Sequence, residues 1–224
     1  MKIWRIHTPS DQLGYPFSAS HEEVQYYLDI FDKFYKGVSV AEIWKPTMIC
    51  RLHEVDIGRL VQGSAEFLVL TEKAKKLLAP LLKTSVEYLP SIPREKSHKK
   101  ISNFRQITRK KIYQPIIDTV HAEQQYVINI LDIKTIKVID FEQSECEYDE
   151  ESGIVSLVNR LAFKPQLIKD NHLFKIDNSG IDLQNVIFIS DEFKMIVEKN
   201  NLKGLNFAEQ PEDEKNLVWQ TLQS

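Results

Sequence analysis

The chain has few of the residues and patterns from which common catalytic motifs are built. Only 7 of its 224 residues are glycine, and no phosphate-binding or dinucleotide-binding glycine loop occurs. The Gly-x-Ser-x-Gly turn that carries a hydrolase nucleophile is also missing. The histidines lie singly in the sequence, without metal-ligand spacing to one another or to cysteine. We therefore predict no catalytic residues, no cofactor and no metal site.

Cysteine and long apolar runs are equally scarce. Cys50 and Cys146 are the only cysteines, and their spacing fits neither a zinc site nor a disulfide framework, so both are expected to be reduced. The first residues lack the continuous apolar core of a signal peptide. No run approaches the roughly 18 apolar residues that a membrane-spanning helix needs. These absences predict a cytoplasmic protein without a membrane segment.

Two segments of the chain, 119 positions apart, follow the same pattern. Ala65–Pro90 and Gln184–Glu209 each begin with a short apolar run, followed by a hydroxyl residue and then an acid (Thr71-Glu72 and Ser190-Asp191). A helical pattern and an alternating segment come next. The hydroxyl residues are typical N-caps, and the acids suit the positive end of a helix dipole. The pattern predicts strand, helix and strand, twice.

The helices of the two units should bury similar apolar stripes. In the first helix the stripe comprises Ala74, Leu77, Leu78 and Leu81, and Pro80 should kink or end the helix. In the second helix the inward residues are Phe193, Ile196 and Val197, Asn200-Asn201 ends the helix, and Gly204 is expected to adopt a positive φ.

Outside the two units the predicted elements are less regular. A helix should begin at Ser20, with Glu23 completing a capping box, and should end at Gly37. Lys2–Ile6 alternates polar and apolar residues and is predicted as an edge strand, and Asp56–Leu60 as a helical turn. The other predicted strands are Met48–Leu52, Tyr126–Leu131, Ile136–Phe141, Ile154–Leu157, Leu161–Lys164 and Leu173–Ile176. The fold class is α+β: a mixed, mostly antiparallel sheet with a few packed helices, in a single domain of residues 1–224.

One stretch of the chain is strongly basic. Arg94–Lys111 has eight Lys/Arg against one acid, Glu95, and lies within residues 91–125, which we interpret as an exposed insertion. Because the whole chain carries −3 and this stretch +7, the remainder carries about −10. A solvated loop is the simplest interpretation of the stretch. Contact with an acidic protein or with nucleic acid are the alternatives. Residues 211–224 form a polar tail in which Leu217, Val218, Trp219 and Leu222 are expected to dock.

A second stretch is strongly acidic. Residues 140–151 have seven acids in twelve positions. A concentrated negative field attracts a basic partner and raises its association rate, whereas the alternative is an exposed loop without a role. The candidate partner-binding residues are Asp140, Glu142, Glu145, Glu147, Tyr148, Asp149, Glu150 and Glu151. Tyr148 lies between two acids and is the aromatic residue expected to anchor a contact.

The second strand–helix–strand unit resembles the C-terminal signature of a family of bacterial immunity proteins from polymorphic toxin systems, first catalogued as a domain of unknown function. The similar residues are the strand Ile187–Ile189, the pair Ser190-Asp191, the helix Glu192–Lys199 and the run Leu202–Phe207. The similarity continues upstream in Trp44-Lys45-Pro46, Phe67–Leu82, Tyr88-Leu89-Pro90, Tyr126–Asp132, Asp140 with Ser144, and Leu173–Ile176, where Lys175 replaces an arginine. Residues 91–125 are longer than the family's usual connection.

The resemblance implies an α+β cytoplasmic protein that binds a cognate toxin domain and blocks it, without catalysis of its own. Many toxin domains are basic nucleases, so the acidic stretch 140–151 suits the role of a phosphate mimic. The alternative from another class is a nucleic-acid-binding accessory protein that uses residues 94–111, which the net charge disfavours. A third is an enzyme whose site is assembled from dispersed residues, which would show no sequence motif.

Overall fold

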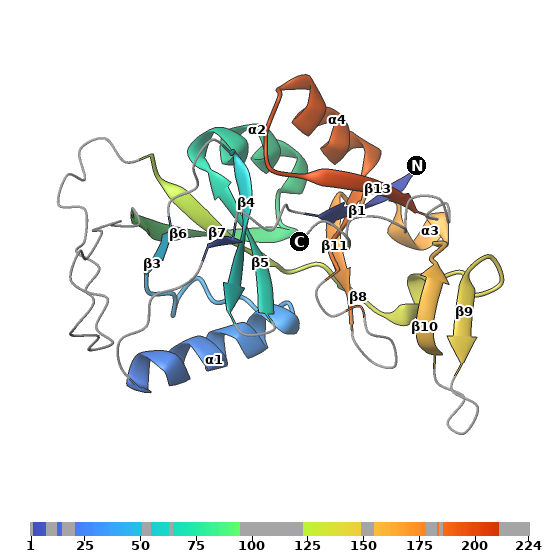
Figure 1. The fold of residues 1–224 in the computed structure, drawn as a ribbon, viewed down its shortest axis with the longest axis horizontal. Coiled ribbons are helices and arrows are strands. Elements are labelled where there is room, and N and C mark those ends of the chain that lie inside the picture. The colour runs from blue at the N-terminus through green and yellow to red at the C-terminus, as the bar shows by residue number, and fades with distance from the viewer. Residues whose placement is uncertain are drawn as a thin grey trace, which may run out of the picture.

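The computed structural model describes residues 2–7, 13–14, 21–50, 55–62, 65–94, 123–148, 155–177, 183 and 186–210. They form two large mixed sheets, a small hairpin and a few helices, which confirms the α+β class (Figure 1). The predicted tail 211–224 and most of the basic insertion lie outside the described residues.

The first sheet has six strands in the order β2-β4-β5-β7-β6-β3. Their bounds are β2 Leu13–Gly14, β4 Ile57–Gln62, β5 Ala65–Thr71, β7 Gln125–Ile130, β6 Val86–Arg94 and β3 Thr47–Cys50. The four inner strands pair antiparallel, whereas the outer strands β2 and β3 pair parallel to their neighbours. Strand β6 therefore continues through Arg94, and the insertion predicted at 91–125 has both of its ends in this sheet.

The second sheet has five strands in the order β13-β1-β12-β11-β8. Their bounds are β13 Asn206–Gln210, β1 Ile3–His7, β12 Phe188–Ser190, β11 Leu173–Ile176 and β8 Ile133–Lys134. Strand β8 pairs parallel to β11, and the other pairs are antiparallel. A separate hairpin consists of β9 Glu145–Tyr148 and β10 Val155–Arg160.

Four α-helices and one short 3-10 helix complete the described elements. They are α1 His21–Tyr35, α2 Glu72–Leu82, α3 Pro165–Ile168, α4 Asp191–Lys199 and η2 Ile136–Val138. Helices α2 and α4 pack against each other on one side of the sheets, and α1 covers the opposite face of the six-stranded sheet (Figure 1).

The two sheets repeat the same arrangement of strands and pairing. In the first, β5 and β6 flank β7, and α2 connects β5 to β6; in the second, β12 and β13 flank β1, and α4 connects β12 to β13. The register agrees as well: Leu70 pairs with Tyr126 as Ile189 pairs with Trp4, and Tyr88 pairs with Ile128 as Phe207 pairs with Ile6. Strand β1 is therefore the counterpart of β7, and the predicted sequence repeat is a structural one.

Equivalent side chains make equivalent contacts in the two units. Lys75 of α2 places its ammonium 3.6 Å from the ring centroid of Tyr126 and 5.6 Å from that of Tyr88. In the second unit, the ammonium of Lys194 lies 4.2 Å from the Trp4 ring and 5.8 Å from the Phe207 ring. These are cation–π contacts between a helix and two strands of its sheet.

The first acid of each helix completes this contact. Glu72 accepts a hydrogen bond from Tyr126; burial, together with that bond, raises the pKa of Tyr126 to about 12. Asp191 accepts from the indole Nε1 of Trp4 at 2.7 Å. Each unit therefore ties the first turn of its helix to the aromatic residue of its central strand.

The N-caps predicted at Thr71 and Ser190 are confirmed, whereas Ser20 lies outside the described residues. Thr71 accepts from the backbone N of Ala74, and Ser190 from that of Phe193, each at 3.3 Å. Helix α4 ends at Lys199 and is capped by Asn200; Asn201 follows with a φ of +50°, and the backbone N of Leu202 donates to Val197 O at 2.9 Å. This is the bonding of a Schellman motif with asparagine in place of glycine. Gly37 and Gly204 have positive φ, as predicted.

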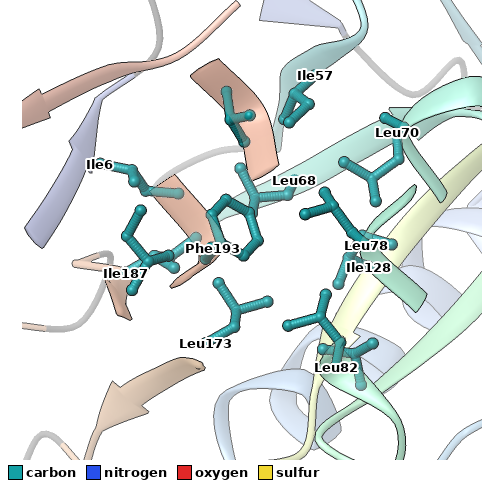
Figure 2. Packing of buried hydrophobic residues seen from close by; sticks show 14 of the residues in the cluster. Ile6, Ile57, Leu68, Leu70, Leu78, Leu82, Ile128, Leu173, Ile187 and Phe193 are labelled. Carbon is teal, nitrogen blue, oxygen red and sulfur yellow. The ribbon is translucent and has the colours of Figure 1, made fainter. Parts of the chain in front are cut away.

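The main core lies between α2, α4 and one face of both sheets (Figure 2). Phe193 of α4 lies at its centre, among side chains from both units such as Leu68, Leu173 and Ile187 (Figure 2). Neighbouring strand residues point to opposite faces, so Leu68 and Leu70 enter this core whereas Phe67 and Val69 pack against α1. Because both units contribute, one hydrophobic core joins them.

Each outer sheet face has a core of its own. Ile30, Phe31 and Phe34 of α1 pack on the six-stranded sheet, where the Phe31 and Phe34 rings each lie 4.8 Å from the Phe67 ring. Leu28 of the same helix points away from this core and is 53% exposed. The outer face of the five-stranded sheet packs against the segment with η2 and α3, through residues such as Val138, Ile168, Phe174 and Phe188.

Several predicted elements differ from the structure. Lys2–Ile6 was expected to form an edge strand, but β1 lies between β12 and β13. Both faces of β1 are buried, since Ile6 enters the main core and Ile3 enters the core on the opposite face. Residues Asp56–Leu60 belong to a hairpin of β4 with β5 rather than to a helical turn. Helix α2 runs two residues beyond Pro80.

The segment before the acidic hairpin also differs. Ile136–Phe141 was expected to be a strand, but it contains η2, and only Ile139 forms a bridge, with Phe163. The strand expected at Leu161–Lys164 is likewise reduced to that bridge and is followed by α3, which the sequence did not predict. The apolar residues of this segment pack against the five-stranded sheet individually and not as a paired strand.

Candidate partner-binding surface

The described part of the acidic segment, residues 140–148, forms a turn that leads into the hairpin β9–β10. Residues 141–143 form the turn, and β9 follows directly. Glu142, Glu145 and Glu147 are exposed, whereas Asp140 is half-buried. Glu145 and Glu147 are two positions apart in a strand, so their side chains leave on one face of the hairpin. The structure thus brings these two predicted residues onto the same surface.

The remaining predicted residues of this surface are described only in part. The backbone of Tyr148 pairs with Val155. Asp149, Glu150 and Glu151 lie outside the described residues. In the hairpin, Glu145 pairs in register with Arg160 and Glu147 with Leu157. The hairpin extends from the five-stranded sheet at the side away from α1 (Figure 1).

Ser144 holds the start of the hairpin to the rest of the fold. Its hydroxyl donates to Asp140 O at 2.6 Å and accepts from the backbone N of Ala162 at 2.9 Å. The backbone N of Asp140 in turn donates to Ala162 O at 3.0 Å. The Asp140-x-x-x-Ser144 pattern therefore fixes the base of the acidic turn, and Asp140 acts there mainly through its backbone.

The other motifs that carry the family resemblance have structural roles too. The indole Nε1 of Trp44 donates to Pro90 O at 2.8 Å, which joins the Trp44-x-Pro46 and Leu89-Pro90 motifs. Lys175, which replaces the family's arginine, is only 4% exposed, with its ammonium 5.6 Å from the Phe67 ring. These contacts give the motifs a role in holding the fold together.

A buried polar cluster fixes the segment after α1. The Nδ2 of Asn129, fully buried in β7, donates to Val38 O at 2.9 Å and to Glu87 Oε2 at 2.8 Å. Glu87 also accepts from the Ser39 hydroxyl and from the backbone N of Val40. Burial alone would raise the pKa of Glu87, but these hydrogen bonds outweigh it and hold the pKa below its usual value of 4.5.

The Glu87 cluster predicts an acid-sensitive contribution to stability. A carboxylate whose pKa is lower in the folded than in the unfolded chain stabilises the fold above its unfolded pKa and loses that contribution as the pH falls through the folded value. We expect the difference in unfolding free energy between wild type and Glu87→Gln to shrink as the pH is lowered from about 6 to about 3. Urea unfolding at both pH values measures it.

Glu42→Gln, which changes an exposed carboxylate, is the matched control. A difference between wild type and Glu87→Gln that stays constant over this pH interval would contradict the assignment.

One trio of side chains superficially resembles a hydrolase triad. His172 Nδ1 lies 3.0 Å from Ser190 Oγ and 3.5 Å from Glu192 Oε2. In a triad the serine and the acid contact different nitrogens of the imidazole ring, whereas here both face Nδ1. Ser190 is 1% exposed and caps α4. The trio therefore lacks the arrangement that would pass a proton through histidine.

The described part of the chain holds neither a metal-binding cluster nor a membrane-spanning helix. There, no group of three or more His, Cys, Asp or Glu side chains is placed to hold a metal ion. Among the same residues, none of the helices has the length and apolar character needed to cross a bilayer. Of the basic stretch 94–111, only Arg94, at the end of β6, is described.

Comparison with protein-family models places the chain in a family. The model of the immunity protein family Imm11 matches residues 95–212, more than half of the 224 residues. The chain belongs to the Imm11 immunity protein family. A search of the curated proteins found no match.

The matched region of this Imm11 member runs from β7 to β13, and it includes the acidic turn, the hairpin and the strands and helix of the second unit other than β1. It begins within the basic stretch that was expected to depart from the family. The upstream similarities from Trp44 to Pro90 fall outside it, as does β1, the central strand of the second unit.

Proposed function

We propose that this protein is an immunity protein that binds and neutralises a cognate toxin effector domain in competition between bacteria, and that it acts in the cytoplasm. Membership of the Imm11 family is the observation that carries the proposal. The described residues support it through what they offer: a large shared core, a charged hairpin, and a serine–histidine–glutamate trio without triad geometry. Such a molecule works by surface complementarity.

The test of this function is protection from a toxin. We expect a gene next to the one for this chain to encode a secreted protein whose variable C-terminal domain is the candidate toxin. Its toxin domain should stop bacterial growth when expressed alone and should fail to do so when this chain is co-expressed. The purified pair should form a complex on size-exclusion chromatography. Growth arrest that persists despite equal expression of this chain would overturn the proposal for that pair.

We further propose that the acidic turn and hairpin contact a basic surface of the toxin. Glu142, Glu145 and Glu147 are exposed, and the last two leave one face of β9. Exposed charges of one sign steer an oppositely charged partner and mainly affect the association rate. If the toxin is a nuclease, these carboxylates would take the place of its substrate phosphates.

Replacing these three glutamates by serine should slow association by at least about tenfold at low salt and weaken its salt dependence. The matched control is Glu42, Glu123 and Glu192→Ser, which removes the same charge from exposed positions elsewhere. Association rates measured by surface plasmon resonance across salt concentrations distinguish the two variants. Equal rates for both would remove the acidic surface from the proposal while leaving neutralisation itself intact.

A further inference from the structure

A groove of about 740 Å³ lies where α4 meets β1 and β13. Its apolar walls are Trp4, Val197, Leu202, Leu205 and Phe207, and its polar edge comprises Lys194, Glu198, Asn201, Lys203 and Asn206. Trp4 is held in place from both sides, since its indole N donates to Asp191 and the Lys194 ammonium lies over its ring. The groove is therefore a built feature of the second unit.

The first unit fills the corresponding region with its own side chains. Leu82 and Val86, 1% and 5% exposed, lie at the positions equivalent to Asn201 and Leu205. Asn201 is exposed and Leu205 only half-buried. The second unit thus leaves apolar surface uncovered where the first, built on the same plan, covers it.

The edge of the sheet beside the groove differs between the units in the same way. The outer side of β6 pairs with β3, from Thr47 opposite Ser91 to Cys50 opposite Arg94. Its counterpart β13 is the outermost strand of the five-stranded sheet, as far as the described residues extend. An apolar groove next to an outer strand is a surface on which an added segment can pack and pair.

The sequence that follows β13 has the matching chemistry in the matching order. Three acids at positions 212–214 come first, followed by the apolar residues Leu217, Val218, Trp219 and Leu222. Gln210, the last residue of β13, pairs with Ile3. The ammonium groups of Lys2 and Lys194 lie near this end, 5.9 and 4.2 Å from the Trp4 ring centroid. The apolar groove walls Phe207 and Leu205 lie near the opposite end of β13, where the strand begins.

The segment between Gln210 and Leu217 is long enough to bring Leu217 back to the groove. Phe207 precedes Gln210 by three residues, so the way back along β13 is about 10 Å at the rise of a strand. Leu217 follows Gln210 by seven residues, which reach about 23 Å when extended. We propose that the segment Leu217–Leu222 of the same chain occupies the groove between α4 and β13, with the acids 212–214 beside Lys2 and Lys194. This inference does not depend on the proposed toxin.

Photo-crosslinking of the full chain tests the inference. The photoreactive residue p-benzoylphenylalanine is introduced in place of Trp219, and the crosslinked peptides are identified by mass spectrometry. We expect links within one chain to Trp4 and to residues 201–207. Mixing isotopically heavy and light chains before irradiation separates links within a chain from links between two chains.

The matched control keeps the photoreactive residue and replaces Leu217, Val218 and Leu222 by serine. These positions belong to neither strand–helix–strand unit in the sequence, so the variant keeps every side chain of the two units. The yield of groove links should fall at least about tenfold, because burial of apolar side chains drives the docking. Links scattered over the surface, links between heavy and light chains, links unaffected by the serines, or no links at all would each overturn the inference.

Discussion

Deleting residues 1–7 is expected to destroy the native structure of the second unit. Strand β1 supplies the hydrogen-bonding partners of both β12 and β13 and places Ile3 and Ile6 in two different cores. Its loss leaves two inner strand edges unpaired and exposes both cores, which no nearby element can repair. Hydrogen exchange measured by mass spectrometry should show lost protection of Phe188–Ser190 and Asn206–Gln210.

The point variant Ile6→Ala should destabilise the second unit in the same way but to a smaller extent. It keeps the backbone pairing and removes only a buried side chain, so it should cost about 2–5 kcal/mol of unfolding free energy. Lys2→Ala, at an exposed position, should cost less than about 1 kcal/mol. Retention of wild-type protection in β12 and β13 after the deletion would show that β1 is dispensable and that the assigned pairing is wrong.

Gly37→Ala is expected to destabilise the protein by about 2–5 kcal/mol, from backbone strain and overpacking together. Gly37 has a φ of +63°, which disfavours any residue with a Cβ. A Cβ there would lie 2.5 Å from Ile133 Cγ1 and 2.7 Å from Leu131 O. The Leu131 backbone cannot move freely, because its N donates to Ser85 O and its O accepts from Ile133 N.

The neighbouring variant Lys36→Ala is the control for Gly37. Lys36 pairs with Asp32 on the surface at 2.7 Å, and loss of such a pair changes stability by at most about 1 kcal/mol. Chemical denaturation of both variants measures the contrast. Equal stabilities for Gly37→Ala and wild type would mean that the turn after α1 does not approach the β7–β8 connection as closely as the structure shows.

Local features of the fold could be predicted from the sequence, because they depend on neighbouring residues. The N-caps Thr71 and Ser190, the inward faces of α2 and α4, and the end of α4 at Asn200-Asn201 are confirmed. Sheet order could not be predicted in the same way. The alternation in residues 2–6 indicates a strand, but only its distant partners, more than 180 positions along the chain, decide that it lies inside the sheet.

The errors also have physical causes. Ile136–Phe141 is rich in β-branched residues, yet burial of Val138 and Ile139 against the five-stranded sheet sets its conformation in place of strand pairing. The segment 56–60 contains Gly58 and was assigned a helical turn, whereas pairing with β5 makes it a strand. In both cases a contact distant in sequence outweighs the local preference.

The candidate surfaces differ in how far the sequence could reveal them. The acidic stretch is visible as composition, although only the structure shows that Glu145 and Glu147 share a strand while Asp140 is half-buried at the base of the turn. The groove was missed because its walls come from both ends of the sequence, Trp4 and Leu205 among them. The repeat held a signal: Asn201 occupies the position at which the first unit has Leu82.

The place of β1 has a consequence for how the polypeptide is made. The ribosome synthesises β1 before its two hydrogen-bonding neighbours, β12 and β13, which follow more than 180 residues later. At a translation rate of about 5–20 residues per second, that delay is about 10–40 s. During this interval the described strands of the first unit have all been synthesised, whereas β1 of the second unit still lacks its partners β12 and β13. Maturation should therefore proceed in two stages, and the last event should be the pairing of β12 and β13 with β1.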